Sequence, residues 1–236
     1  MSSLIFAAAQ FEPAPGKVEA NMEKHLAFAQ RAALKGAQIL IFPELSITGY
    51  EPELAQELAF SQDDVRLLPL IKAAQESAVT LVAGLPLLLH GKLHIAACIC
   101  APNGSLSFYT KHHLHDGEER FFEPGSLNPQ LEINGKKVAL AICADTAHSI
   151  HPRNAARDGA DVYAAGIFFT PNGYDADAVL LQSYAQEHQM AVVIANFIGR
   201  SGGFDAAGRS AAWASSGQRV GELSPDREEL LLVELE

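Results

Sequence analysis

The chain has 236 residues, of which 48% are hydrophobic and 19% charged, a composition typical of a globular protein. Its formal net charge of -11 disfavours nucleic acid and anionic membranes as partners, because both are themselves negatively charged. No apolar stretch approaches the roughly 20 residues that cross a bilayer, and the N-terminus lacks the positive region of a signal peptide. We therefore expect a cytoplasmic protein that forms one domain over residues 1–236.

Strand and helix patterns alternate through the first half of the chain. Short apolar runs predict buried strands, and apolar residues three and four apart predict amphipathic helices. One helix is expected from Val18 to Lys35, and a second from Asp63 and Asp64 to about Ser77. The strands expected here lie at residues 4–9, 38–42, 79–83, 95–101 and 106–110, the last two joined by a hairpin turn at Asn103-Gly104.

The second half repeats this alternation. Helices are expected over residues 155–158, where Gly159 ends the helix, and over residues 175–189. Residues 199–217 are expected to form a loop with short strands. The remaining strands are expected at residues 131–133, 137–142, 162–165, 191–195 and 230–235, the first two joined by a hairpin turn at Asn134-Gly135. This alternation, with its two hairpins, predicts an α/β fold in which helices pack on a mixed sheet.

Three polar or reactive side chains stand directly after apolar strands. Glu44, Lys111 and Cys143 each follow a run of residues that reads as a buried strand. Side chains at strand ends in α/β sheets converge on pockets, so these three residues are candidates for one catalytic site.

A carboxylate, an ammonium group and a thiol together suit acyl transfer. A thiol becomes a strong nucleophile as the thiolate, and Glu44 can take its proton while Lys111 stabilises the resulting charge. The same ammonium group and the backbone N–H of Ala144 can hold the oxyanion that forms when a carbonyl carbon is attacked. This chemistry needs no metal and no organic cofactor.

Other polar clusters in the sequence have simpler interpretations. Cys98 and Cys100 face the same side of one apolar strand and are expected to be buried and inert. The histidines and the aspartate of residues 112–116 have spacings that also occur in zinc sites, but we expect them to order the turn that carries Lys111. The glycines of residues 199–203 lack the spacing of a dinucleotide-binding loop. We therefore expect no metal and no nucleotide site.

Three motifs in the chain carry a family resemblance. The first covers residues 42–50, the second residues 109–125, and the third residues 138–145 with a continuation at residues 157–162. In these motifs, which occur in family order and span nearly the whole chain, the sequence resembles the nitrilase superfamily of carbon–nitrogen hydrolases. The ordered combination is far more specific than any one motif.

The resemblance implies a four-layer α-β-β-α sandwich that forms a homodimer or a higher homo-oligomer. It also implies roles for single residues: Glu44 as general base and acid, Lys111 as the oxyanion-stabilising cation, and Cys143 as the nucleophile. Glu118 is implied as a second carboxylate that positions substrate and holds the lysine. The further candidate substrate-binding residues are Tyr50, Ala144, His148 and Phe168.

The chain departs from the family pattern beside the nucleophile. Ala144 stands where the family usually has an aromatic residue, and residues 146–152 replace an aromatic-Pro-acidic stretch that helps to shape the pocket. The substrate class is therefore open among amides, ω-amides, carbamoyl amines and nitriles. We expect hydrolysis of a small linear amide or carbamoyl compound to a carboxylic acid plus ammonia or amine, through a thioester. The alternatives are an acyltransferase, in which an amine replaces water, and a non-catalytic binding or scaffold protein on the same fold.

Overall fold

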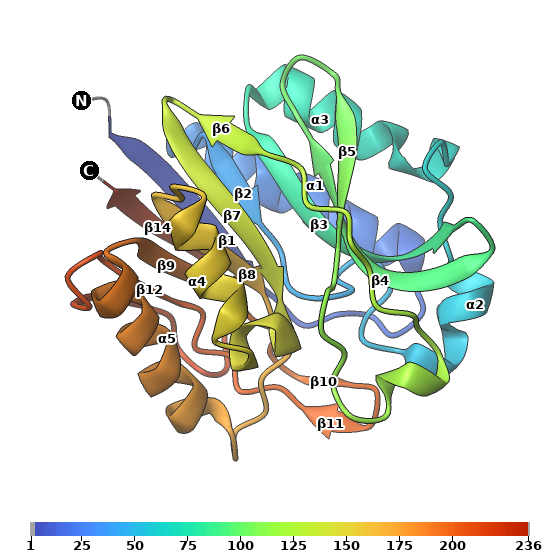
Figure 1. Ribbon diagram of the computed structural model, residues 1–236. Coiled ribbons are helices and arrows are strands. Elements are labelled where there is room, and N and C mark those ends of the chain that lie inside the picture. Colours follow the sequence, from blue (N-terminus) through green and yellow to red (C-terminus); the bar gives the residue numbers. More distant parts are fainter. Residues whose placement is uncertain (1–2, 236) are drawn as a thin grey trace.

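The computed structural model describes residues 3–235, which form two six-stranded sheets stacked between helices (Figure 1). The first sheet has the order β14 (Glu229–Leu235), β1 (Leu4–Gln10), β2 (Ile39–Ile41), β3 (Thr80–Leu89), β4 (Lys92–Cys100), β5 (Leu106–Thr110). The second has the order β13 (Arg219–Glu222), β12 (Ala211–Trp213), β9 (Ala191–Ala195), β8 (Val162–Gly166), β7 (Lys136–Ile142), β6 (Leu131–Ile133). The expected four-layer α-β-β-α sandwich is confirmed.

Helices cover the outer faces of both sheets (Figure 1). Helices α1 (Val18–Leu34) and α3 (Leu68–Ser77) contact each other and cover the first sheet, while α5 (Tyr174–His188) packs on β9 of the second sheet with α4 (Ile150–Arg157) beside it. The shorter elements are η1 (Pro52–Leu54), α2 (Ala55–Leu58), η2 (Val65–Leu67), η3 (Glu118–Arg120), η4 (Cys143–Ala147), β10 (Arg200–Ser201) and β11 (Phe204–Asp205), where η marks a 3-10 helix. No helix within residues 3–235 is long and apolar enough to cross a membrane.

The central strands are buried on both faces, which explains their unbroken apolar sequences. In β1, Phe6 and Ala8 join the core cluster that also contains Ile142 of the second sheet. Their neighbours Ala7 and Ala9 join the cluster that contains Phe28 of α1. Successive side chains on a strand point to opposite faces, so a strand covered on both sides must be apolar at every position.

Two glycines allow the backbone of residues 42–45 to pass close to both sheets. A Cβ atom at Gly84 in β3 would lie 2.3 Å from the backbone nitrogen of Leu45, and one at Gly166 in β8 would lie 2.5 Å from the carbonyl oxygen of Phe42. Both separations are shorter than a Cβ atom tolerates, and both involve backbone atoms. Glycine is therefore required at these positions for the turn that carries Glu44.

We expect Gly166→Ala to destabilise the protein by about 3 kcal/mol, because the added methyl group must displace backbone of the turn before Glu44. The matched control is Gly173→Ala, whose Cβ atom would lie 3.3 Å from the flexible Asp177 side chain. Urea denaturation of both variants measures the difference. Equal unfolding free energies would show that the backbone of residues 42–45 shifts freely and that the glycine is not needed.

The strand expected at residues 79–83 is longer than predicted, because β3 continues through Gly84 and Pro86 to Leu89. Proline is tolerated here because β2 pairs with β3 only as far as Val82. Beyond that point separate residues contact this side of β3: the Ile47 N–H donates to the Gly84 carbonyl and the Phe60 N–H to the Pro86 carbonyl, each over 2.9 Å. Pro86 thus occupies what is nearly an edge position, where a missing N–H costs little.

Two other expectations also need correction. Helix α4 begins at Ile150, five residues before the start expected at residue 155, because Pro152 falls in its first turn, where proline is tolerated. The single mixed sheet expected from the alternation of elements is instead two separate sheets. Apolar periodicity identifies strands but does not record which strands pair.

Candidate active site

Glu44 is held in a buried turn directly after β2. The turn contains Leu45 in the left-handed region, with φ of 51°. Ser46 anchors it to the first sheet: its hydroxyl accepts the Gly84 N–H over 2.9 Å and lies 2.9 Å from Nε2 of His25. Burial lowers the pKa of His25 to about 4, so this histidine is a neutral hydrogen-bonding group of the scaffold.

Cys143 stands at the sharp bend between β7 and η4. Its φ of 42° is rare for a residue other than glycine and costs on the order of 1–3 kcal/mol. Strain of this kind persists only where neighbouring groups fix the backbone. Here the Asp145 carboxylate accepts the N–H of Ile142 over 3.0 Å, and the Thr146 hydroxyl donates to the Cys143 carbonyl over 2.8 Å.

The same Asp145 carboxylate joins the cysteine bend to the lysine turn after β5. Its Oδ1 atom accepts the backbone N–H groups of His112 over 3.0 Å and His113 over 2.8 Å, and its Oδ2 atom accepts the Tyr109 hydroxyl over 2.7 Å. Asp145 therefore fixes Lys111 relative to Cys143. The sequence offered one signal for this role, an acidic residue within a buried apolar stretch two positions after the nucleophile, but no role was predicted for it.

Lys111 is fully buried between two carboxylates. Its ammonium group donates to Oε1 of Glu44 over 2.7 Å and to both carboxylate oxygens of Glu118 over 2.9 and 2.8 Å. Glu118 is held in turn by the Tyr50 hydroxyl and by the His115 N–H, each over 2.8 Å. The second carboxylate oxygen of Glu44 has no hydrogen-bond partner among the described residues.

Burial and neighbouring charges set the proton affinities at this site. Burial, with the charge of Glu118, raises the pKa of Glu44 to about 7 against the opposing effect of Lys111. Burial and the charge of Glu44 raise the pKa of the Cys143 thiol well above its usual value. Burial lowers the pKa of Lys111, but the charges of Glu44, Cys143 and Glu118 outweigh it and leave that pKa above its ordinary value. The resting site thus holds a protonated thiol, a charged ammonium group and a carboxyl that titrates near neutral pH.

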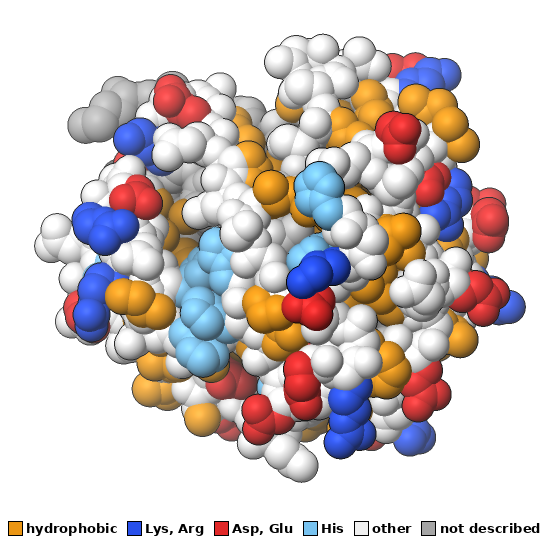
Figure 2. Space-filling view, turned by 45° about the vertical axis from the view of Figure 1, so that its right-hand side comes forward, with side chains coloured by type: hydrophobic (Ala, Val, Ile, Leu, Met, Phe, Trp, Pro, Cys, Tyr) orange, Lys and Arg blue, Asp and Glu red, His pale blue; other side chains and the backbone are white. Residues whose placement is uncertain are grey.

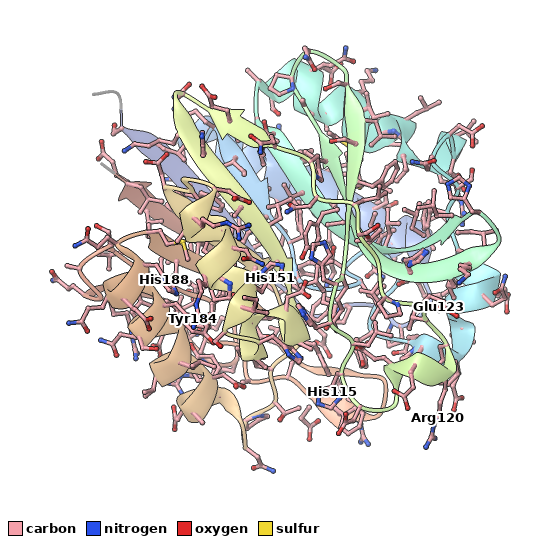
Figure 3. The ribbon with its side chains drawn as sticks, viewed as in Figure 1. His115, Arg120, Glu123, His151, Tyr184 and His188 are labelled. Atoms are coloured by element: carbon pink, nitrogen blue, oxygen red, sulfur yellow. The ribbon has the colours of Figure 1, made fainter. Side chains whose placement is uncertain are left out.

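A cavity of about 850 Å³ opens from this site to the surface. Glu44, Cys143 and Glu118 lie at its inner end, and the Tyr50 and Phe168 rings stack on its wall with centroids 5.1 Å apart. The Cys143 sulfur lies 3.9 Å from the Phe168 carbonyl oxygen. Further lining comes from η1, from η3 with the loop before it, and from the β10–β11 hairpin; Figure 3 shows His115 and Arg120 on that part of the molecule.

Most of the sequence-predicted site residues lie together in this region. Glu44, Tyr50, Glu118, Cys143 and Phe168 all line the cavity, with Lys111 buried behind them. Two candidates lie elsewhere. Ala144 is buried in η4 and does not line the cavity, so its predicted role rests on its backbone N–H alone. His148 is exposed and stacks on His113 with ring centroids 4.2 Å apart, outside the cavity lining.

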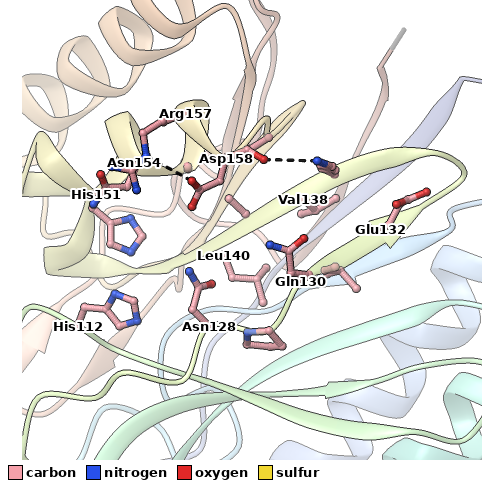
Figure 4. A pocket seen from close by; sticks show the side chains of 16 residues that line it. His112, Asn128, Gln130, Glu132, Val138, Leu140, His151, Asn154, Arg157 and Asp158 are labelled. Carbon is pink, nitrogen blue, oxygen red and sulfur yellow. Dashed lines mark hydrogen bonds and ion pairs between the residues drawn. The ribbon is translucent and has the colours of Figure 1, made fainter.

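A group of histidines lies beside the site, and Figure 2 shows several histidine side chains together on one face. His112 and His151 lie with ring centroids 5.3 Å apart at one end of a second cavity of about 250 Å³, shown in Figure 4. His151 is held between the hydroxyls of Tyr109 and Tyr163, at 2.8 and 2.9 Å. No group of three or more His, Cys, Asp and Glu side chains within residues 3–235 is arranged to hold a metal ion.

Comparison of the chain with models of known protein families identifies a family that agrees with the sequence motifs and the site geometry. The family model described as carbon-nitrogen hydrolase matches residues 6–236. The chain belongs to the carbon–nitrogen hydrolase family. The predicted membership of the nitrilase superfamily is thereby confirmed, and the protein is an amidase-like hydrolase of carbon–nitrogen bonds other than peptide bonds.

Relatives of this family member include enzymes with several names. A nitrilase of Pyrococcus abyssi is 28% identical, over 96% of this chain and 87% of its own length. A glutamine-dependent NAD(+) synthetase of Aquifex aeolicus is 29% identical over 97% of this chain, which spans only 41% of that longer protein. A solved structure of the Nesterenkonia AN1 amidase has a TM-score of 0.88 and 28% identity, covering 98% of this chain and 90% of its own.

Proposed function

We propose that this carbon–nitrogen hydrolase cleaves small linear amides or carbamoyl compounds to a carboxylic acid plus ammonia or amine, through a thioester on Cys143. The observation that carries the proposal is the unpaired oxygen of Glu44. One carboxylate oxygen is bound to Lys111, while the other is buried, lacks a hydrogen-bond partner among the described residues and belongs to a side chain that lines the same cavity as Cys143. A general base needs such a free oxygen.

In the first half of the proposed reaction, Glu44 accepts the thiol proton as the Cys143 sulfur attacks the amide carbon. The ammonium group of Lys111 and the Ala144 N–H stabilise the oxyanion of the tetrahedral intermediate. Collapse of the intermediate breaks the carbon–nitrogen bond. Glu44 returns its proton to the leaving nitrogen, which departs as ammonia or amine and leaves a thioester.

In the second half, Glu44 takes a proton from water as the water oxygen adds to the thioester carbon. The carbon–sulfur bond then breaks, the sulfur regains a proton from Glu44, and the carboxylic acid leaves. One carboxylate thus serves both as base and as acid, and a pKa near 7 suits both tasks at neutral pH.

The Nesterenkonia amidase supports the choice of a small amide. Structures of its mutants are described in complex with acrylamide and with butyramide, and another mutant is described as showing covalent addition of the acetamide moiety of fluoroacetamide at its active-site cysteine. The Aquifex relative is named as glutamine-dependent, and glutamine also carries a primary amide.

Ammonia release from a panel of aliphatic amides, ω-amides, carbamoyl amines and nitriles tests this function. We expect amides to be hydrolysed with release of the free carboxylic acid, or carbamoyl amines with release of the amine and carbon dioxide, and we expect nitriles to be poor substrates. Ammonia release that exceeds acid release in the presence of an added amine would indicate acyl transfer instead. Absence of ammonia release from every compound in the panel would contradict the proposal.

The pH dependence of kcat/KM should show an acid limb with a midpoint near 7. Glu44 must be unprotonated to act as base, and its raised pKa places that ionisation near neutrality. Below the midpoint, kcat/KM should fall about tenfold for each pH unit. Circular dichroism at each pH separates this loss from unfolding. A midpoint near 4.3, the ordinary value for glutamate, would contradict the raised pKa of Glu44.

A further inference from the structure

The outer part of the active-site cavity is lined by an excess of acidic side chains. Glu51 and Glu53 from the segment around η1, and Asp116 from the loop before η3, line it together with one fixed cation, Arg120. Three formal negative charges against one positive charge leave this entrance with a net charge of about −2 at neutral pH.

These charges are not neutralised locally. No ion pair within 4 Å joins Glu51, Glu53, Asp116 or Arg120 to an opposite charge among residues 3–235. The Glu51 carboxylate is nevertheless fixed in place: its Oε1 atom accepts the Ser201 hydroxyl and the Gly202 N–H, each over 2.9 Å. At least one acid of the entrance is therefore preorganised.

The inner end of the cavity adds no compensating positive charge. Lys111 faces two carboxylates, those of Glu44 and Glu118, at 2.7–2.9 Å. Glu44 is 1% exposed and presents an oxygen that has no hydrogen-bond partner within residues 3–235, which marks the end where the reacting amide binds. The same cavity is also lined by the Tyr50–Phe168 stack and by the exposed apolar side chains of Leu54, Phe121 and Phe204.

We propose that the substrate is a short aliphatic amide or carbamoyl compound whose far end carries a positive charge, such as a primary ammonium group. This inference rests on the proposed function. The amide end meets Glu44 and Cys143, the methylene chain passes the apolar wall, and the cation lies among Glu51, Glu53 and Asp116. A carboxylate at the far end is repelled by the same three acids.

Three amides of matched length test the charge preference: 5-aminopentanamide, hexanamide and the monoamide of glutaric acid. We expect kcat/KM to be about tenfold higher for the ammonium amide than for the neutral one, and lowest for the carboxylate amide, since each partly exposed charge contributes a few-fold. Raising the ionic strength should narrow these ratios, because exposed charges are screened by salt.

The triple variant Glu51→Gln, Glu53→Gln, Asp116→Asn should remove the preference, lowering kcat/KM for 5-aminopentanamide about tenfold and leaving that for hexanamide within about twofold. The control is Glu57→Gln, an exposed acid of α2 that does not line the cavity. Turnover of hexanamide with no charge preference would overturn this inference and leave the proposed function standing. If the enzyme turns over none of these three amides and releases no ammonia from any compound of the wider panel, both this inference and the proposed function are overturned.

Discussion

Replacing Cys143 with alanine should lower kcat for amide hydrolysis by at least about 10⁴-fold, because the proposed acyl-enzyme forms on the Cys143 sulfur. The fold should survive, since the change removes one small, buried atom and costs about 1 kcal/mol. The measurement is ammonia release under saturating amide, with the melting temperature of each protein recorded alongside.

Cys98 provides the matched control. It is a fully buried thiol in β4 outside the cavity lining, and its hydrogen bond with Cys100, together with burial, raises its pKa. Cys98→Ala should lose stability comparable to or greater than that of the Cys143 variant while retaining kcat per folded molecule. Activity that persists in Cys143→Ala would contradict the assignment of the nucleophile.

Replacing Lys111 with methionine should affect both stability and catalysis. The change leaves the buried carboxylates of Glu44 and Glu118 without their shared cation. Removing one member of a buried ion pair costs about 3–5 kcal/mol, and losing an oxyanion-stabilising group lowers kcat by roughly 10²–10³-fold. Urea denaturation and ammonia release measure the two effects.

A second substitution separates these effects. Adding Glu118→Gln to Lys111→Met removes one of the stranded charges, so part of the stability should return while activity does not. Lys72→Met is the surface control: its ion pair with Glu76 spans 3.6 Å and is well exposed, so the loss should stay below about 1 kcal/mol. A Lys111 variant as stable as the Lys72 variant would show that the buried charges are not coupled as described.

Much of the fold follows from local pattern. The apolar runs at β1, β2, β8 and β9 are unbroken because both faces of each strand are covered, and Asn-Gly pairs mark the turns between β4 and β5 and between β6 and β7. The sequence was misleading at Pro86, because a proline normally excludes a strand. Here β3 continues through Pro86, whose side of the strand facing away from β4 is nearly unpaired. The pairing of strands into two sheets depends on long-range contacts and came only from the family motifs.

Local sequence pattern also predicted part of the candidate site. Glu44, Lys111 and Cys143 were marked by their positions after strands, and Glu118 by its motif. The entrance residues Glu51, Glu53 and Asp116 were missed because they lie in irregular segments, where no periodicity shows which side chains face a cavity. His148, a candidate for substrate contact or for a helix start, lies outside the cavity lining and stacks on His113.

The proposed thioester is tested most directly by trapping it. The Glu44→Gln variant lacks the base for both half-reactions. An activated ester such as p-nitrophenyl acetate needs no proton for its leaving group and reacts with the thiolate that forms at alkaline pH, so acylation should outpace hydrolysis of the thioester. After incubation and acid quenching, mass spectrometry should find one acetyl group per chain, mapped to the peptide that contains Cys143 and absent from the Cys143→Ala, Glu44→Gln double variant. An acetyl group mapped to another side chain, or equal labelling of the double variant, would contradict a mechanism that runs through Cys143.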